Sequence, residues 1–107
     1  MIHEGDIERG SGKPPYFDGT NYPYWKIRMF AHLQGIDWQV WVICEDPNYE
    51  VVAAHVGEEQ IDQHNANSKA RSVLFSSLSL SEFERVSDCT TARDIWVRLQ
   101  SCHKGTA

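Results

Sequence analysis

Large apolar residues recur at the spacing of an α-helix in FDGTNYPYWKIRMFAHLQG, residues 17–35, and this pattern constrains the fold most. Four of them are separated by three, four and four positions and so share one helical face: Tyr22, Trp25, Met29 and Leu33. We therefore predict that these aromatic residues begin a hydrophobic core. A binding role stays open for Tyr24 and Phe30, which lie off this face.

The ends of this first helix carry recognisable signals. Asp18-Gly19 predicts a turn, and the side-chain oxygen of Asn21 is expected to cap the helix. Pro23 would then stand in the first turn, where its missing N–H costs nothing. Gly35 is the expected C-terminal stop.

A second, shorter helix is predicted in DWQVWVICED. Asp37 is its expected cap, and Trp38, Trp41 and Val42 are expected on its inner side. Asp46-Pro47 ends it, because the residue before a proline avoids helical backbone angles. The next residues, NYEVVAAHVG, have strand propensity without a partner strand, so we expect an irregular segment or a short helical turn.

The longest helix is predicted over residues 58–78. Its apolar stripe is thin and strengthens toward the C-terminus: Ile61, Ala66, Ala70, Val73, Leu74 and Leu78. The Ser-x-x-Glu sequence that starts at Ser79 has the form of a capping box, and it opens a short helix with Phe83 and Val86 inward.

Thr90 or Thr91 is expected to cap the last helix. Its inner face comprises Ala92, Ile95, Trp96, Leu99 and His103. The predicted class is therefore all-α, a compact bundle of about five short-to-medium helices. Residues 1–15 contain few large apolar side chains among charges, Gly and Pro, so we expect a flexible N-terminal arm before a helical domain over residues 16–107.

Charge and composition exclude several classes of function. The net charge of −5 opposes binding to phosphate backbones, and Lys26 with Arg28 and Lys69 with Arg71 are pairs, not clusters. No apolar run approaches the roughly 20 residues of a membrane span, so no membrane partner is expected. Three cysteines without close spacing suit a reducing compartment, and we expect a cytoplasmic protein.

Signals for catalysis or metal binding are weak. No Cys/His spacing matches a metal site, and no glycine-rich phosphate loop is present, so we expect no cofactor and no small-molecule substrate. Cys102 and His103 are adjacent and would point about 100° apart on a helix. We predict that the protein is not an enzyme. A small hydrolase that uses a cysteine stays an alternative, because Cys and His partners can meet in space.

Two stretches resemble the Gag protein of copia-type LTR retrotransposons. The first carries that family's Gly-x-Asn-Tyr-x-x-Trp signature followed by Met and Leu, here Gly19, Asn21, Tyr22, Trp25, Met29 and Leu33. The second matches the later part of the same Gag region, here Leu80, Ser81, Phe83, Cys89, Thr91, Ala92, Asp94, Ile95, Trp96 and Leu99. The first stretch is most similar to plant elements or to host genes derived from them.

The resemblance implies the N-terminal part of a Gag capsid region, which assembles with copies of itself into virus-like particles. Such a Gag usually continues into a second helical part and a zinc knuckle. Neither is in this chain, so RNA binding is expected only through regions absent from it. Weak homo-association is expected through polar helix faces, with Lys26 and Arg28 as interface residues. The alternative is a domesticated, Gag-derived host protein that serves as a protein–protein interaction module.

Overall fold

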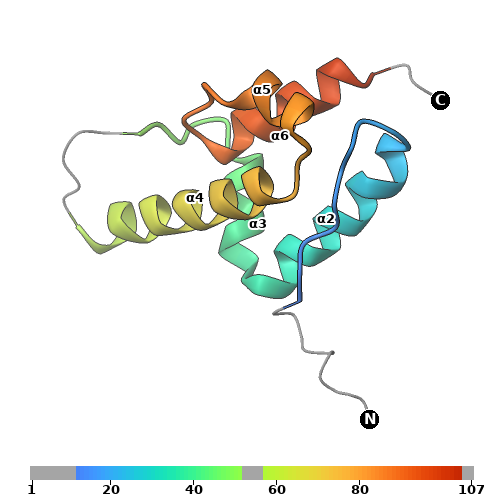
Figure 1. The fold of residues 1–107 in the computed structure, drawn as a ribbon. Helices are drawn as coiled ribbons and strands as arrows, with labels where there is room; N and C mark the ends of the chain where they lie inside the picture. Colours follow the sequence, from blue (N-terminus) through green and yellow to red (C-terminus); the bar gives the residue numbers. More distant parts are fainter. Residues whose placement is uncertain (1–11, 52–56, 105–107) are drawn as a thin grey trace, which may run out of the picture.

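Five α-helices form the computed structural model over the residues that it describes, 12–51 and 57–104 (Figure 1). They are α2 (Tyr22–Ile36), α3 (Trp38–Glu45), α4 (Glu58–Ser76), α5 (Leu80–Val86) and α6 (Ala92–Cys102). These described ranges contain no β-strand, only an isolated parallel bridge between Phe17 and Leu78. The all-α prediction is thus confirmed. Residues 1–11 of the expected arm and residues 52–56 of the expected irregular segment lie outside the described residues.

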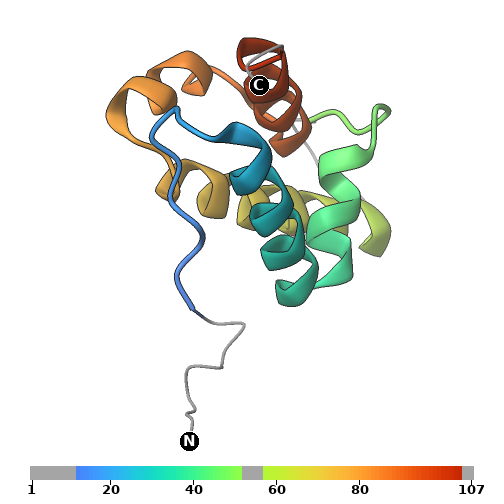
Figure 2. The same ribbon diagram turned by 90° about the vertical axis from the view of Figure 1, so that its right-hand side faces the viewer.

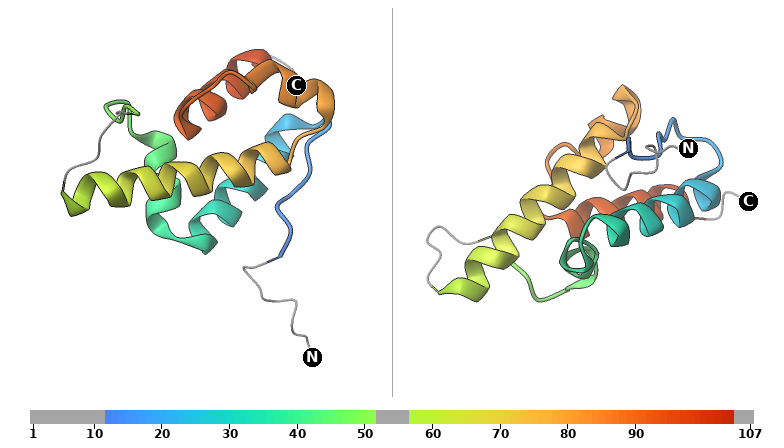
Figure 3. Two further views of the ribbon diagram at one scale, coloured as in Figure 1. Left: turned by 60° about the vertical axis from the view of Figure 1, so that its left-hand side comes forward. Right: turned by 90° about the horizontal axis from the view of Figure 1, so that it is seen from below.

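Helix α3 lies at the centre of the packing, since it contacts α2, α4 and α6. Helix α4 also packs against α6, and α5 packs against α6 (Figure 3). The segment before α2 runs beside that helix and then turns into it (Figures 1 and 2). Two backbone hydrogen bonds hold this segment to the α4–α5 turn: Phe17 N–H donates to Ser77 O at 2.8 Å, and Ser79 N–H donates to Phe17 O at 3.0 Å.

An aromatic cluster joins the first helix to the last. The rings of Trp25 and Trp96 lie 5.8 Å apart between centroids, and Trp41 meets Trp96 edge-on at 5.3 Å. Phe17 stacks on Trp25 at 4.8 Å. All four rings are buried. The prediction that the aromatic stretch begins a core is confirmed.

Three helix starts follow the sequence signals. The Asp37 side chain accepts a hydrogen bond from Gln39 N–H at 2.9 Å, and the Thr91 hydroxyl accepts one from Asp94 N–H at 3.1 Å. Pro23 stands in the first turn of α2. Asn21 is a correction: it is the N-cap residue, but its side chain makes no capping hydrogen bond. Its backbone is left-handed (φ 55°), a conformation that asparagine tolerates better than most residues, and not the extended one from which a cap reaches the helix.

The inner face of α3 was wrongly predicted at two positions. Trp38 is 61% exposed and Val42 is 38% exposed. Nearly every residue of α3 is apolar, so its sequence cannot show which side faces the core, and the contacts with three other helices decide it. The buried residues of α3 are Val40, Trp41, Ile43 and Cys44.

Two helix ends and one stripe residue also differ from prediction. Helix α2 continues through Gly35 to Ile36 and stops where Asp37 becomes extended to cap α3. Helix α4 stops at Ser76, because Leu78 pairs with the segment before α2. Ile61 is 46% exposed, since the first turn of α4 lies at the outer edge of the molecule (Figures 1 and 3).

Within the described ranges, none of the helices is both long enough and apolar enough to cross a membrane.

Candidate functional site

The first motif builds the core and not a binding surface. Tyr22, Trp25, Met29 and Leu33 are all buried on the inner side of α2. The indole N–H of Trp25 donates to the carbonyl oxygen of Pro15 at 2.8 Å, and Pro15, the last residue of the expected arm, is itself buried. Trp25 therefore holds two segments in place: α2, to which it belongs, and the segment around Pro15 that precedes α2.

Gly19 of the same motif lies against a buried carboxylate. Its φ is +99°, and a Cβ placed there would stand 3.0 Å from Glu82 Oε2. Glu82 also lies 2.8 Å from His103 Nε2 and 3.4 Å from Arg85 Nε. Only a residue without a side chain suits both the backbone angle and the close approach at Gly19.

The predicted capping box is only half formed. The Ser79 hydroxyl accepts from Glu82 N–H, as predicted, but at 3.4 Å. The Glu82 carboxylate does not return to Ser79, whose N–H donates to Phe17 O. The Glu82 carboxylate contacts His103 instead. The His103 ring in turn stacks on the Tyr22 ring, with 5.5 Å between their centroids. Glu82 thus joins α5 to the end of α6 and to the first motif.

The second motif forms the turn before α6 and the inner face of that helix. Of the ten residues of this motif, Thr91 caps α6, as described above, and five are buried: Cys89, Ala92, Ile95, Trp96 and Leu99. Leu80, at the start of α5, is exposed. Two side chains of α4 hold this turn. Asn67 donates to Thr90 O at 3.2 Å and accepts from Ala92 N–H at 2.8 Å, and Arg71 donates to Cys89 O at 3.1 Å.

Sequence reasoning missed Asn67 and its role. The residue is almost fully buried in the middle of α4. Asparagine is a poor helix former, because its side chain competes for backbone hydrogen bonds. An Asn between Ala66 and Ala70 on an apolar stripe was therefore a signal that its amide is needed by another segment.

The two buried cysteines, Cys44 and Cys89, do not have the environment of a nucleophile. Burial, helped by the charge of Glu45, raises the pKa of the Cys44 thiol to about 12. Burial also raises the pKa of Cys89. A reactive cysteine needs the opposite shift. Among the residues described, no three His, Cys, Asp or Glu side chains gather closely enough to hold a metal ion.

An open apolar groove of about 650 Å³ lies between α2, α3 and α6. Trp41 and Trp96 form its buried base. Three exposed apolar side chains line it: Ile27 (69% exposed), Phe30 (38%) and Val97 (40%). The motif residue Trp96 thus belongs both to the core and to this groove.

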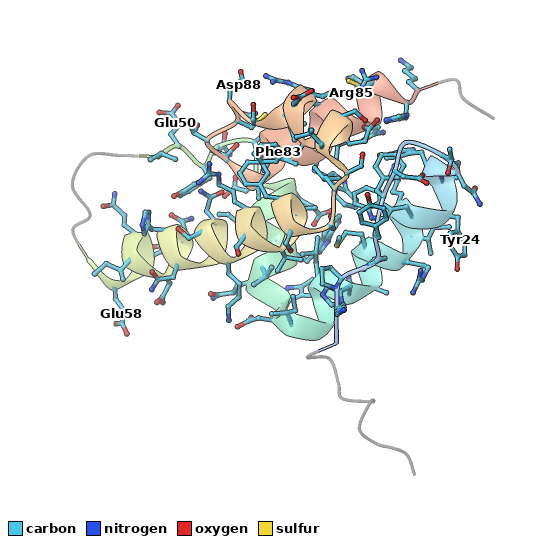
Figure 4. All side chains as sticks on the ribbon, viewed as in Figure 1. Tyr24, Glu50, Glu58, Phe83, Arg85 and Asp88 are labelled. Carbon is cyan, nitrogen blue, oxygen red and sulfur yellow. The ribbon has the colours of Figure 1, made fainter. Side chains whose placement is uncertain are left out.

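Both predicted interface residues are on α2, but they are two positions apart and point in different directions, so only one of them lines the groove. Lys26 is a groove residue, and its Nζ lies 6.0 Å from the centre of the Tyr22 ring. Arg28 is exposed and lies over Tyr24, with Cζ 5.4 Å from the ring centre. Tyr24 points away from the body of the molecule (Figure 4). Of the two aromatic residues left open for binding, only Phe30 lines the groove.

The fold and this surface define a small helical domain whose motif residues hold it together and whose apolar groove faces outward. A comparison with protein-family models matches residues 28–107 of the chain to the gag-polypeptide of LTR copia-type. The chain therefore belongs to the copia-type Gag family, as its motifs predicted. The matched residues begin after Trp25, so most of the first motif precedes them. Comparisons with curated proteins and with solved structures found no match.

Proposed function

We propose that this domain contributes to the assembly of virus-like particles by associating weakly with other copies of itself. Membership of the copia-type Gag family supports a structural role. The apolar groove between α2, α3 and α6 is the observation that carries the finer proposal. It leaves Ile27, Phe30 and Val97 in contact with water, although a folded monomer gains nothing from this exposure.

The rim of the groove favours a protein partner over a lipid or nucleic-acid one. Lys26 of α2, Arg93 of α6 and Glu45 of α3 line the groove, so two cations and an acid accompany the apolar residues. An apolar centre with a polar rim is the usual construction of a protein–protein interface. The net charge of −5 opposes RNA, and we propose that RNA reaches the particle through regions absent from this chain.

Association through a groove of this size should be weak. A closed shell tolerates weak contacts, because each subunit makes several and their effects multiply. We expect dissociation constants in the high micromolar to millimolar range, about −4 to −6 kcal/mol for each contact. The raised pKa values of the buried thiols support a non-catalytic protein. We propose that it acts in the cytoplasm, consistent with three free cysteines.

Sedimentation equilibrium over about 1 µM to 1 mM tests this proposal, with electron microscopy of any large species. The wild-type chain should be monomeric at the low end and associate at the high end. Charge reversal by Lys26→Glu with Arg28→Glu should change the association constant and leave the melting temperature unchanged. A chain that stays monomeric throughout would refute self-assembly. A dimer that survives dilution to nanomolar would instead favour a domesticated interaction module.

A further inference from the structure

A second hollowed surface lies on the other side of α3. It is a hollow of about 360 Å³ between α3 and the first turns of α4, and it includes the exposed Val42. Four of its lining residues are acids, and none is a cation: Asp46, Glu58, Glu59 and Asp62. We call this surface the acidic hollow.

The groove and the acidic hollow use opposite faces of α3. Trp41 and Glu45 line the groove, whereas Val42 and Asp46 line the hollow. With Cys44 added to the groove set and Gln39 and Ile43 to the hollow set, the two sets centre on directions roughly 150° apart at about 100° of rotation per residue. Figure 4 places Glu58, at the start of α4, at the opposite end of the molecule from Tyr24 on α2. One copy can therefore use both surfaces at once.

The two surfaces carry opposite charges. Two cations and one acid line the groove: Lys26, Arg93 and Glu45. Within ranges 12–51 and 57–104, Lys26 and Arg93 form no ion pair with a carboxylate, and neither do Glu58, Glu59 and Asp62 with a cation. Both sets of charges are thus available to a partner, and both surround exposed apolar side chains.

We propose that the groove of one copy packs against the exposed acids that line the acidic hollow of the next, in a head-to-tail contact. This inference rests on the proposed self-association. Val42 would meet Ile27, Phe30 and Val97, while Lys26 and Arg93 face the acids of α4. Pairing the hollow with itself would place acid against acid, which like-charge repulsion disfavours, and pairing the groove with itself would leave one cation of each copy without an acid.

A head-to-tail contact leaves surfaces free for further growth. After two copies associate, one still offers a free groove and the other a free acidic hollow. Contacts of this kind close into a ring or extend further, whereas a self-complementary contact stops at a dimer. The same two surfaces would therefore suffice to build an array from one kind of subunit.

A charge-swap experiment tests the contact. The groove variant is Lys26→Glu with Arg93→Glu, and the hollow variant is Glu59→Lys with Asp62→Lys. All four substituted residues are polar, and none is in the core. Glu84→Lys on α5, an exposed residue in neither surface, is the control. Melting curves and sedimentation at low and high salt are measured for each variant alone, for an equimolar mixture and for the four-substitution chain.

We expect each two-substitution variant alone to associate at least about tenfold more weakly than wild type, which corresponds to about 1.4 kcal/mol. The mixture and the four-substitution chain should associate more strongly than either two-substitution variant alone, because the cations introduced by Glu59→Lys and Asp62→Lys then face the acids introduced by Lys26→Glu and Arg93→Glu. The control should match wild type. Recovery in the four-substitution chain also shows that the swapped residues have not unfolded the domain.

Two results would separate this inference from the proposed function. If wild type associates but the hollow variant matches it, the head-to-tail contact is wrong and self-association stands. The head-to-tail contact is also wrong if both variants are weakened and neither the mixture nor the four-substitution chain recovers. If wild type does not associate up to about 1 mM, both proposals fail.

Discussion

Replacement of Asn67 by alanine tests whether α4 holds the turn before α6 through a single amide. In the structure, Asn67 Oδ1 accepts from the buried N–H of Ala92 at 2.8 Å, and its Nδ2 donates to Thr90 O at 3.2 Å. Ala92 is the first residue of α6, so its N–H has no partner within the helix. Alanine would leave that donor buried and unpaired.

The magnitude follows from these two bonds. Each contributes about 1 kcal/mol net, and the unpaired buried N–H of Ala92 costs about 1 kcal/mol more. Alanine is the better helix former and returns up to roughly 0.7 kcal/mol. The free energy of unfolding should therefore fall by about 2–3 kcal/mol, and the melting temperature by roughly 10–20 °C. A domain that holds about 5–15 kcal/mol stays folded after this loss.

Urea denaturation of Asn67→Ala and Asn65→Ala gives a matched comparison. Asn65 lies on the same helix but is exposed. Its replacement makes the same chemical change and should leave stability unchanged or slightly raised. Hydrogen exchange adds a local measurement, since the Ala92 amide should exchange faster only in Asn67→Ala. If both variants lose equal stability and the Ala92 amide stays protected, the amide bridge does not hold the turn.

Three further predictions concern stability. Gly19→Ala should lower the free energy of unfolding by about 1–3 kcal/mol, because φ is +99° and the added Cβ approaches a carboxylate. Gly35→Ala, inside α2 with open space around it, should instead raise it by about 0.5–1 kcal/mol, and urea denaturation measures both changes. Trp96→Ala should lower the free energy of unfolding by about 3–5 kcal/mol, and replacement of the exposed Trp38 by alanine should lower it by less than about 0.5 kcal/mol. Equal losses of stability in calorimetry would contradict the assignment of Trp96 to the core. Burial raises the pKa of Cys44 from 9.0 to about 12, so unfolded chains release this proton first and stability should fall as pH rises between these values. Denaturation midpoints of Cys44→Ala should lack this part of the alkaline loss, and parallel pH profiles would refute it.

Helical periodicity predicted the inner face of α2 because the polar residues Lys26, Arg28 and Gln34 lie mostly off that face. Spacing alone identified Tyr22, Trp25, Met29 and Leu33, and all four are buried. In α3 the same reasoning was wrong for Trp38 and Val42, since an almost wholly apolar helix has no period to detect. In such a helix the neighbouring elements choose the buried face.

Long-range partners were out of reach of local signals. The Ser79 cap was predicted correctly, yet the Glu82 carboxylate contacts His103, which lies 21 positions away in the sequence. The Asn67 amide meets Thr90 and Ala92 across a similar separation. A capping box is a pattern within one turn of the chain. It cannot predict that a distant group such as His103 will contact the carboxylate oxygen of Glu82. These contacts follow only from the arrangement of α4, α5 and α6.

The residues that identify the family and the residues proposed to assemble it are almost separate sets. Trp25 and Trp96 make the fold recognisable because the core needs them, and a buried ring cannot by itself contact a partner. The exposed Ile27 and Val97 contribute nothing to the motifs. Trp96 is the exception, since it packs on Trp25 and also forms the base of the groove. Changes around the groove can therefore alter association while the fold is kept, whereas changes at Trp96 would alter both together.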